Sequence, residues 1–408
     1  MPKFKKDIQY FKFSAYGFLK NLRFFDAFLL LFFLENGISY SQIGVLYAAR
    51  QLVINIAEVP SGIVADVYGR KNALIVAFSC NILSFITFYF STDFFLLLVA
   101  MVLFGIGDAF RTGTHKGMIL DYLKWHGWLD QKVSYYGHTR SWSQRGSALS
   151  SLVAGILVLY TGSYRIVYLY SIIPYLLNFV NIISYPKELN RYTGGEPKLE
   201  ERSILSVIKS FWESIKSPEV LRIMNSTVMH TSFLKAVKDY IQPIMVQVAL
   251  LIPVLSAFDD KRKSGLIIGL LYFGIYMLNS AAARNASKLT EMGISKIPKK
   301  TLLLGFTTGI ICGVFILQEF WIASLITFVV IYIIQNLRKP ILIGAIAEEV
   351  PRDIIASVLS AQSFYSTIST SIIALLMGVF ADMWGIAVAL MIVSGILLSI
   401  TMALRGVE

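Results

Sequence analysis

Residues 62–71 have the sequence Gly-Ile-Val-Ala-Asp-Val-Tyr-Gly-Arg-Lys and join two long apolar stretches, 41–67 and 72–92. A glycine at the start allows two helices to approach closely, and Gly69 permits a tight turn. The Asp66 carboxylate lies at the end of a predicted helix, where it can meet a basic partner or another helix terminus. The two bases that follow favour the charged surface of a membrane. This order of residues indicates a tight loop between two membrane-spanning helices.

Similar apolar stretches occupy most of the chain. The 408 residues are 56% hydrophobic, with a mean hydropathy of +0.64, which is too apolar for the surface of a soluble domain. A helix of about 20 apolar residues spans the hydrocarbon core of a bilayer. We therefore predict an all-α membrane protein with twelve transmembrane helices, at residues 14–34, 41–67, 72–92, 94–122, 133–160, 164–185, 219–252, 264–287, 300–317, 320–347, 355–381 and 385–404.

Lysine and arginine residues outside these stretches lie mainly on one side of the predicted membrane. If the N-terminus is cytoplasmic, only Arg165, Lys261, Arg262 and Lys263 fall in outer loops. Because cytoplasmic loops carry the excess of bases, we expect a multi-pass protein of the cytoplasmic membrane with both termini inside. The net charge of +12 does not indicate nucleic-acid binding, since the bases are spread over separate loops of a chain that contacts lipid.

One long polar segment divides the chain. Residues 186–218 separate a predicted N-terminal six-helix bundle, residues 1–185, from a C-terminal one, residues 219–408. The second part of this cytoplasmic linker has apolar residues at helical spacing among charged ones, which predicts a helix along the membrane surface. A partly disordered tether is the alternative.

Charged residues repeat between the two predicted bundles. Arg111 and Arg338 each precede an acidic residue by the same interval, and Asp26 and Asp239 form a weaker second pair. Matching charges in two halves are typical of transporters whose substrate site lies near the middle of the membrane, between repeats. The pattern therefore predicts transport of a solute.

The segment 62–71, between the second and third of twelve predicted helices, resembles the signature of the major facilitator superfamily. The resemblance implies two pseudo-symmetric six-helix bundles that move a small solute by alternating access. Two departures leave the direction of transport open. The corresponding C-terminal loop keeps Arg284 and Lys288 without the glycines and the aspartate, and residues 133–160 lack the glycine-proline element of the superfamily's antiporters. The resemblance also implies that Asp66 and Arg70 act in the gate. We assign the whole signature segment to the gate, with the residues Gly62, Asp66, Gly69, Arg70 and Lys71.

Charged residues inside the predicted helices are candidates for the transport site, because each is costly in a membrane and usually lines a cavity or meets a partner. Spacing of three or four residues predicts ion pairs between Arg23 and Asp26, between Asp108 and Arg111, and between Lys235 and Asp239. Bases still exceed acids after such pairing, which predicts an anionic or zwitterionic substrate. The candidate substrate-binding or coupling residues are Arg23, Asp26, Asp108, Arg111, His115, Arg140, Arg145, Lys235, Asp239 and Arg338.

The stretch 94–122 concentrates this chemistry. Asp108, Arg111 and His115 are three and four residues apart, so a continuous helix places them on one face. Histidine titrates near neutral pH and can pass protons. Arg140 and Arg145 are predicted to contact an anion or to pair with acids such as Asp108.

Cofactor, metal and disulfide chemistry have no support in the sequence. The four histidines show no ligand spacing, and no phosphate-binding glycine loop precedes a Lys-Ser or Lys-Thr pair. Cys80 and Cys312 lie singly in apolar stretches. The favoured function is a monomeric, proton-coupled transporter of a small organic solute, with Asp26 as the candidate proton carrier. A drug or lipid exporter of the same superfamily, and an intramembrane enzyme or sensor using His115 and Asp108, are the alternatives.

Overall fold

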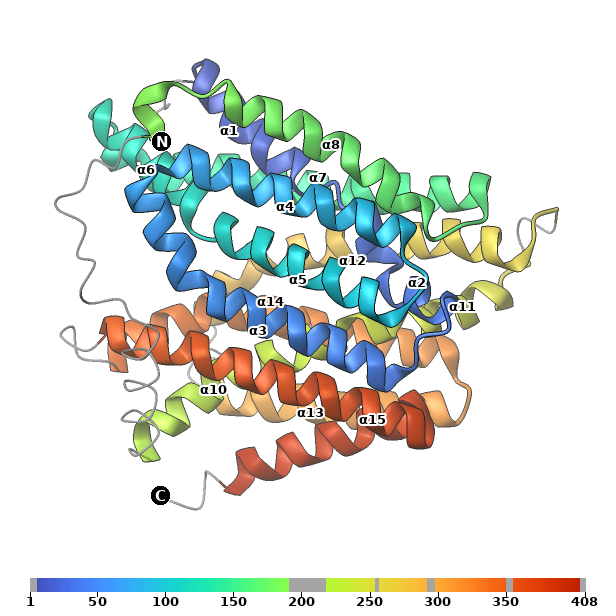
Figure 1. Ribbon diagram of the computed structural model, residues 1–408. Helices are drawn as coiled ribbons and strands as arrows, with labels where there is room; N and C mark the ends of the chain where they lie inside the picture. The colour runs from blue at the N-terminus through green and yellow to red at the C-terminus, as the bar shows by residue number, and fades with distance from the viewer. Residues whose placement is uncertain (1–5, 191–217, 254–256, 292–297, 350–354, 404–408) are drawn as a thin grey trace.

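The computed structural model describes residues 6–190, 218–253, 257–291, 298–349 and 355–403. These residues form helices and their connections, without a β-strand. The long helices run side by side, with the N-terminal helices (blue to green) on one side of the molecule and the C-terminal helices (yellow to red) on the other (Figure 1). The prediction of an all-α fold is confirmed for the described part of the chain.

We refer to the two sets of helices as the N-terminal group and the C-terminal group. The N-terminal group comprises α1 (Ile8–Leu19), η1 (Phe24–Ala27), α2 (Leu29–Glu35), α3 (Tyr40–Val67), α4 (Arg70–Phe90), α5 (Phe94–Arg111), α6 (Thr114–Trp125), η2 (Leu129–Gln131), α7 (Lys132–Thr161), α8 (Ile166–Ile183) and η3 (Lys187–Asn190). The C-terminal group comprises α10 (Pro218–Val237), η5 (Lys238–Tyr240), α11 (Ile241–Leu251), α12 (Asp260–Glu291), α13 (Pro298–Leu317), α14 (Trp321–Glu349) and α15 (Ile355–Ala403). The predicted surface helix of the linker lies outside the described residues.

The apolar helices fit a membrane by length and composition. Within the described residues, six helices are long and apolar enough to cross a bilayer, and a shorter apolar helix covers Thr301–Leu317. The chain is thus a multi-pass helical membrane protein, and the count of twelve spans stays a prediction. The six helices cover Arg70–Phe90, Phe94–Trp125, Ile166–Ile183, Asp260–Ala282, Trp321–Arg338 and Gln362–Ala403.

Three of the predicted stretches are interrupted near their middle. In 14–34 the helix stops after α1, the backbone at Arg23 is non-helical (φ −98°, ψ 84°), and η1 precedes α2. In 94–122 the break separates α5 from α6, where Gly113 has φ +78°, a conformation that favours glycine. In 219–252 the 3₁₀ turn η5 separates α10 from α11. The predicted stretches 14–34, 94–122 and 219–252 are therefore not continuous helices.

The last two predicted stretches, 355–381 and 385–404, form one helical element, α15. Its backbone is non-helical at Gly385 (φ 82°, ψ 164°), so the chain changes direction there. The predicted boundary between the two stretches therefore coincides with this kink.

We name the ends of the bundle by two residues. The Arg70 end carries the short connections before α4, after α6 and after α8, and the Glu35 end carries those before α3, α5 and α8. At the Glu35 end the groups touch, because Lys261 forms an ion pair with Glu35. The backbone amides of Tyr40 and Ser41 also donate hydrogen bonds to the Asp382 carboxylate, at 2.8 and 2.7 Å.

Small residues bring helices of the two groups into close contact. A Cβ atom added at Gly44 of α3 would lie 2.6 Å from the carbonyl oxygen of Ala374 in α15, and one added at Gly378 would overlap the carbonyl oxygen of Tyr40. In the same way, Gly269 of α12 fits against the backbone of Ser151 in α7. Such small-residue crossings are typical of packed membrane helices.

Candidate functional site

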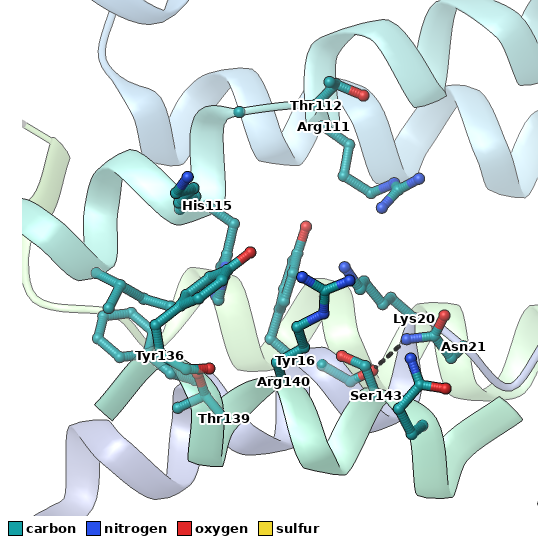
Figure 2. A pocket seen from close by; sticks show the side chains of 16 residues that line it. Tyr16, Lys20, Asn21, Arg111, Thr112, His115, Tyr136, Thr139, Arg140 and Ser143 are labelled. Atoms are coloured by element: carbon teal, nitrogen blue, oxygen red, sulfur yellow. Dashed lines mark hydrogen bonds between the residues drawn. The ribbon is translucent and has the colours of Figure 1, made fainter. Parts of the chain in front are cut away.

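A cavity of about 400 Å³ lies in the N-terminal group, between α1, α7 and the break that joins α5 to α6. Its volume is within the roughly 300–1,000 Å³ that is typical of small-molecule sites. Figure 2 shows the cavity, with the side chains of Tyr16, Lys20, Arg111 and Arg140 pointing into it. The lining includes Tyr16, Lys20, Asn21, Arg111, Thr112, His115, Lys116, Tyr136, Thr139, Arg140, Ser143 and Gln144.

Helices α1 and α7 form the base of the cavity and touch through small residues. A Cβ atom added at Gly17 would lie 2.8 Å from the Ser143 hydroxyl, and one added at Gly146 would overlap the carbonyl oxygen of Phe18. The α1 helix ends just beyond this contact, and the Asn21 amide donates to the Gly17 carbonyl at 2.7 Å. This close packing holds the end of α1, with its Lys20 side chain, beside α7.

The break before α6 decides how Arg111 and His115 face the cavity. Because the backbone at Thr112 and Gly113 is non-helical, the two residues lie on different helices, and the prediction of one shared helical face is wrong. Both still line the cavity. The His115 ring stacks on Tyr16, with ring centroids 3.5 Å apart and planes 6° apart.

The cavity is strongly cationic. The described residues that line it include four bases, Lys20, Arg111, Lys116 and Arg140, and no aspartate or glutamate. Figure 2 shows Arg111, Arg140 and Lys20 pointing toward one another into the open space, from three different elements. Converging cations repel each other, and a bound anion offsets that repulsion.

Asp108 lies next to the cavity and binds three guanidinium groups. Its carboxylate is 2.8 Å from Arg23, 2.8 Å from Arg50 and 2.7 Å from Arg111, and the residue is 6% exposed. The predicted pairing of Asp108 with Arg111 is confirmed. Arg23 bonds with Asp108 rather than with Asp26, because the break after α1 turns its side chain toward α5.

The ends of this cluster are fixed by aromatic residues. The Arg23 Nε group donates to the Tyr175 hydroxyl at 2.7 Å. The guanidinium groups of Arg23 and Arg50 lie 4.9 and 4.3 Å from the centre of the Phe104 ring. Cation–π contacts of this kind stabilise charges that have left water. Arg111 is therefore held on one side by Asp108 and exposed on the other to the cavity.

The two acids of the broken helices lie in matching elements. Asp26 is in η1 and Asp239 is in η5. Asp26 borders a very small cavity together with Ser147, Ser150 and Tyr276, and no ion pair joins its carboxylate to a described residue within 4.0 Å. Asp239 pairs with Lys238 at 3.3 Å. The predicted ion pair between Asp239 and Lys235 is not found, because η5 interrupts the helical spacing on which it depended.

The remaining candidates lie away from the cavity. Arg145 is exposed and its guanidinium lies 4.8 Å from the Trp142 ring centre. Neither Arg140 nor Arg145 is a partner of Asp108 in the described ion pairs. Arg338 is 1% exposed in the C-terminal group, where it donates to Thr301 at 2.5 Å and to the Ser226 carbonyl. Lys235 is exposed in α10.

The signature segment, residues 62–71, connects α4, α6 and α8 at the Arg70 end of the N-terminal group, and we call the contacts of Gly69, Arg70 and Lys71 the clamp. Arg70 forms an ion pair with Asp121 of α6, and the Lys71 ammonium donates to the carbonyls of Ile183 and Tyr185, at 2.6 and 2.9 Å. Gly69 has φ +96° and packs against Asn190, where a side chain would not fit.

The other two signature residues give less support to the predicted gate. The close helix approach expected at Gly62 is not found, since an added Cβ atom there meets no atom within 4 Å. The side chain of Asp66 lies outside the described residues. The clamp therefore depends on Gly69, Arg70 and Lys71 among the residues that the structure describes.

Several site residues were absent from the predicted set. Lys20 and Arg50 are bases within apolar stretches, and that alone could have indicated them. Tyr16, Ser143 and Gln144 are residue types that occur throughout membrane helices, so only the fold places them at the cavity. In the described residues no group of three or more His, Cys, Asp or Glu side chains could hold a metal ion, and Cys80 and Cys312 are free thiols.

Comparisons with known proteins agree with this architecture. The solved nucleoside transporter NupG (D323A mutant) superposes with a TM-score of 0.75 at 12% identity, covering 97% of this chain and 99% of that one. A POT family transporter in complex with 5-aminolevulinic acid gives 0.71 at 12% identity, with 97% and 95% covered. A D-xylose-proton symporter gives 0.66 at 11% identity, with 95% and 96% covered. At these identities the likeness shows the fold alone.

Sequence comparison gives the family. An uncharacterized MFS-type transporter of Bacillus subtilis (strain 168), YxaM, is 29% identical over 105 residues, which is 26% of this chain and 26% of that protein. The family model of the Major Facilitator Superfamily matches residues 17–291, which is more than half of the chain. The protein is a transporter rather than an enzyme, and it belongs to the Major Facilitator Superfamily.

Proposed function

We propose that the protein is a secondary active transporter of a small organic anion. The observation that carries this proposal is the charge of the cavity: its described lining residues include Lys20, Arg111, Lys116 and Arg140 and no carboxylate. The amide groups of Asn21 and Gln144 and the hydroxyl group of Ser143 supply neutral hydrogen-bonding partners. An anion of small-molecule size satisfies these donors and offsets the repulsion among the bases.

A zwitterion fits the cavity less well than an anion. The lining bases would repel an ammonium group, and Asp108, which contacts the lining residue Arg111, already binds three guanidinium groups. Of the two substrate classes that the sequence left open, the charges of the described residues favour the anion.

The proposed mechanism is alternating access between two six-helix halves, residues 1–185 and 219–408, with twelve spans in total. In this proposal the Arg70 end and both termini face the cytoplasm, the protein acts as a monomer in the cytoplasmic membrane, and the substrate enters the cavity while the Glu35 end is closed. The clamp formed by Arg70, Lys71 and Asp121 then holds the N-terminal half rigid as it rocks.

Replacing Arg140 with alanine is expected to weaken anion binding about 10- to 100-fold, because a hydrogen bond to a charged group contributes about 1.5–3 kcal/mol. The measurement is uptake of a panel of carboxylates, phosphate esters and sulfonates into proteoliposomes, with binding followed by calorimetry. Arg145→Ala is the matched control, since Arg145 lies on the same helix and outside the cavity lining. The proposal fails if no anion is transported, or if the two variants bind the transported anion equally.

We further propose that protons drive accumulation and that Asp26 carries them. Its carboxylate makes no ion pair with a described residue, and it lies in the broken first stretch beside a very small cavity. Such a group can gain and lose a proton without the rearrangement of an ion pair.

Asp26→Asn is expected to keep substrate exchange and to abolish accumulation driven by an imposed pH gradient. Both are measured in the same proteoliposomes, and Asp130→Asn in the exposed turn η2 serves as the control. Accumulation by the Asp26 variant at the parental level would assign coupling to another group.

A further inference from the structure

Gln242 connects the two groups of helices at the break in the first stretch. It lies in the first turn of α11 and is 0% exposed. Its side-chain oxygen accepts hydrogen bonds from the backbone amides of Leu30 and Leu31, at 3.0 and 3.3 Å. Its side-chain nitrogen donates to the backbone carbonyl of Asp26 at 3.1 Å and to the Tyr272 hydroxyl at 3.4 Å.

The bonds to Leu30 and Leu31 replace a helix cap that α2 does not supply itself. The first amides of a helix have no partner within that helix, and they are usually satisfied by a polar side chain just before the helix. Here that position is Phe28, whose side chain makes no such bond. The cap comes instead from the opposite group, through Gln242.

We infer that Gln242 is a positioning residue of the transport cycle, which stabilises the state closed at the Glu35 end and holds the charged segment 23–26 in place. When the groups separate at the Glu35 end, α11 moves away from α2. Three backbone groups of the first stretch then lose their partner together, and water must reach them. The Gln242 amide thereby couples the position of Arg23 and Asp26 to the opening and closing of the Glu35 end.

No residue adjacent to Gln242 in the sequence offers a substitute for its hydrogen bonds between the two groups. Its sequence neighbours Ile241, Pro243 and Ile244 carry no polar side chain that could take over its bonds. A second glutamine between the groups, Gln51 of α3, makes one bond of 3.4 Å, to Thr367 of α15. Gln51 is therefore a matched control of the same residue type.

The test uses a thiol reporter and needs no substrate. In a Cys80→Ala, Cys312→Ala background, Ala48→Cys places a thiol on α3, where the Ala48 carbonyl faces Ser371 of α15 and the residue is 4% exposed. Purified protein in nanodiscs is labelled with a polar maleimide. Gln242→Met, which keeps the side-chain length and removes the hydrogen bonds, is expected to speed labelling about tenfold or more, whereas Gln51→Met changes the rate less than twofold.

A second reporter separates gate opening from general loosening. Ala100→Cys lies inside the N-terminal group, where the residue is 0% exposed and its carbonyl accepts a bond from Ser84. It is expected to stay unlabelled in Gln242→Met. Gln242→Glu keeps the acceptor for Leu30 and Leu31 and is expected to give an intermediate labelling rate at the Ala48 position. This variant also provides the test if Gln242→Met does not fold.

Two results would overturn the inference. One is equal labelling of the Ala48 reporter in the parent and in both Gln242 variants. The other is faster labelling at both reporter positions, because that indicates loss of packing rather than a shift of the gate. Neither outcome depends on the charge of the substrate, so the proposed anion specificity stands or falls separately.

Discussion

Asp108→Ala is expected to abolish transport and to destabilise the protein by about 3–5 kcal/mol, the cost of removing one partner from a buried ion pair. The carboxylate that binds Arg23, Arg50 and Arg111 would be lost, and three neighbouring guanidinium groups would repel each other within the bundle. Arg111 would also lose the contact that aims it at the cavity. Thermal unfolding in detergent and uptake into proteoliposomes measure the two effects.

Asp93→Ala is the control for this prediction. Asp93 caps the same helix, α5, by accepting bonds from the amides of Phe95 and Leu96, and its loss should cost about 1 kcal/mol. The interpretation of the Asp108 cluster would be wrong if the two alanine variants unfolded at the same temperature and transported at the same rate.

Gly378→Leu is expected to reduce transport at least about tenfold, because a side chain at this position has no space while the Glu35 end is closed. An added Cβ atom overlaps the Tyr40 carbonyl, which belongs to the backbone and cannot rotate away. The closed state is therefore destabilised relative to the state in which α3 and α15 separate. Uptake assays and labelling of a cysteine at position 48 report this shift.

Gly395→Leu provides the comparison on the same helix. A Cβ atom added at Gly395 meets nothing within 4 Å, so leucine there faces open space and should leave both measurements near the parental values. Parental transport by Gly378→Leu would show that contact between α3 and α15 at this point is not needed in the cycle.

The sequence predicts the helical stretches well because membrane insertion is governed by apolar length, which is a local property. The family signature between α3 and α4 is also local, and its bases and Gly69 do form contacts that tie the Arg70 end together. The breaks after α1 and before α6 were not predicted. Gly113 was a signal for the second, but the first contains no glycine or proline between Lys20 and Phe28, so its cause lies in tertiary contacts.

Ion pairs were harder to predict than helices. Helical spacing gives partners within one helix, and it identified Asp108 with Arg111. It cannot give partners on different helices, so it assigned Arg23 to Asp26 and missed Arg50. Gln242 was missed for a further reason: it carries no charge, and a neutral amide within an apolar stretch has no evident role until the helix that it caps is placed beside it.

The cluster around Asp108 also gives the transporter a way to sense the membrane potential. Three guanidinium groups and one carboxylate sum to a net charge of +2, close to a cavity with further bases. A charge moved through the whole membrane field changes in energy by about 2.3 kcal/mol per 100 mV. An empty carrier that displaces this cluster as it rocks therefore moves positive charge through part of the field, whereas a bound dianion would cancel the +2 of the cluster. In a polarised cell the voltage would then act mainly on the step in which the empty carrier returns.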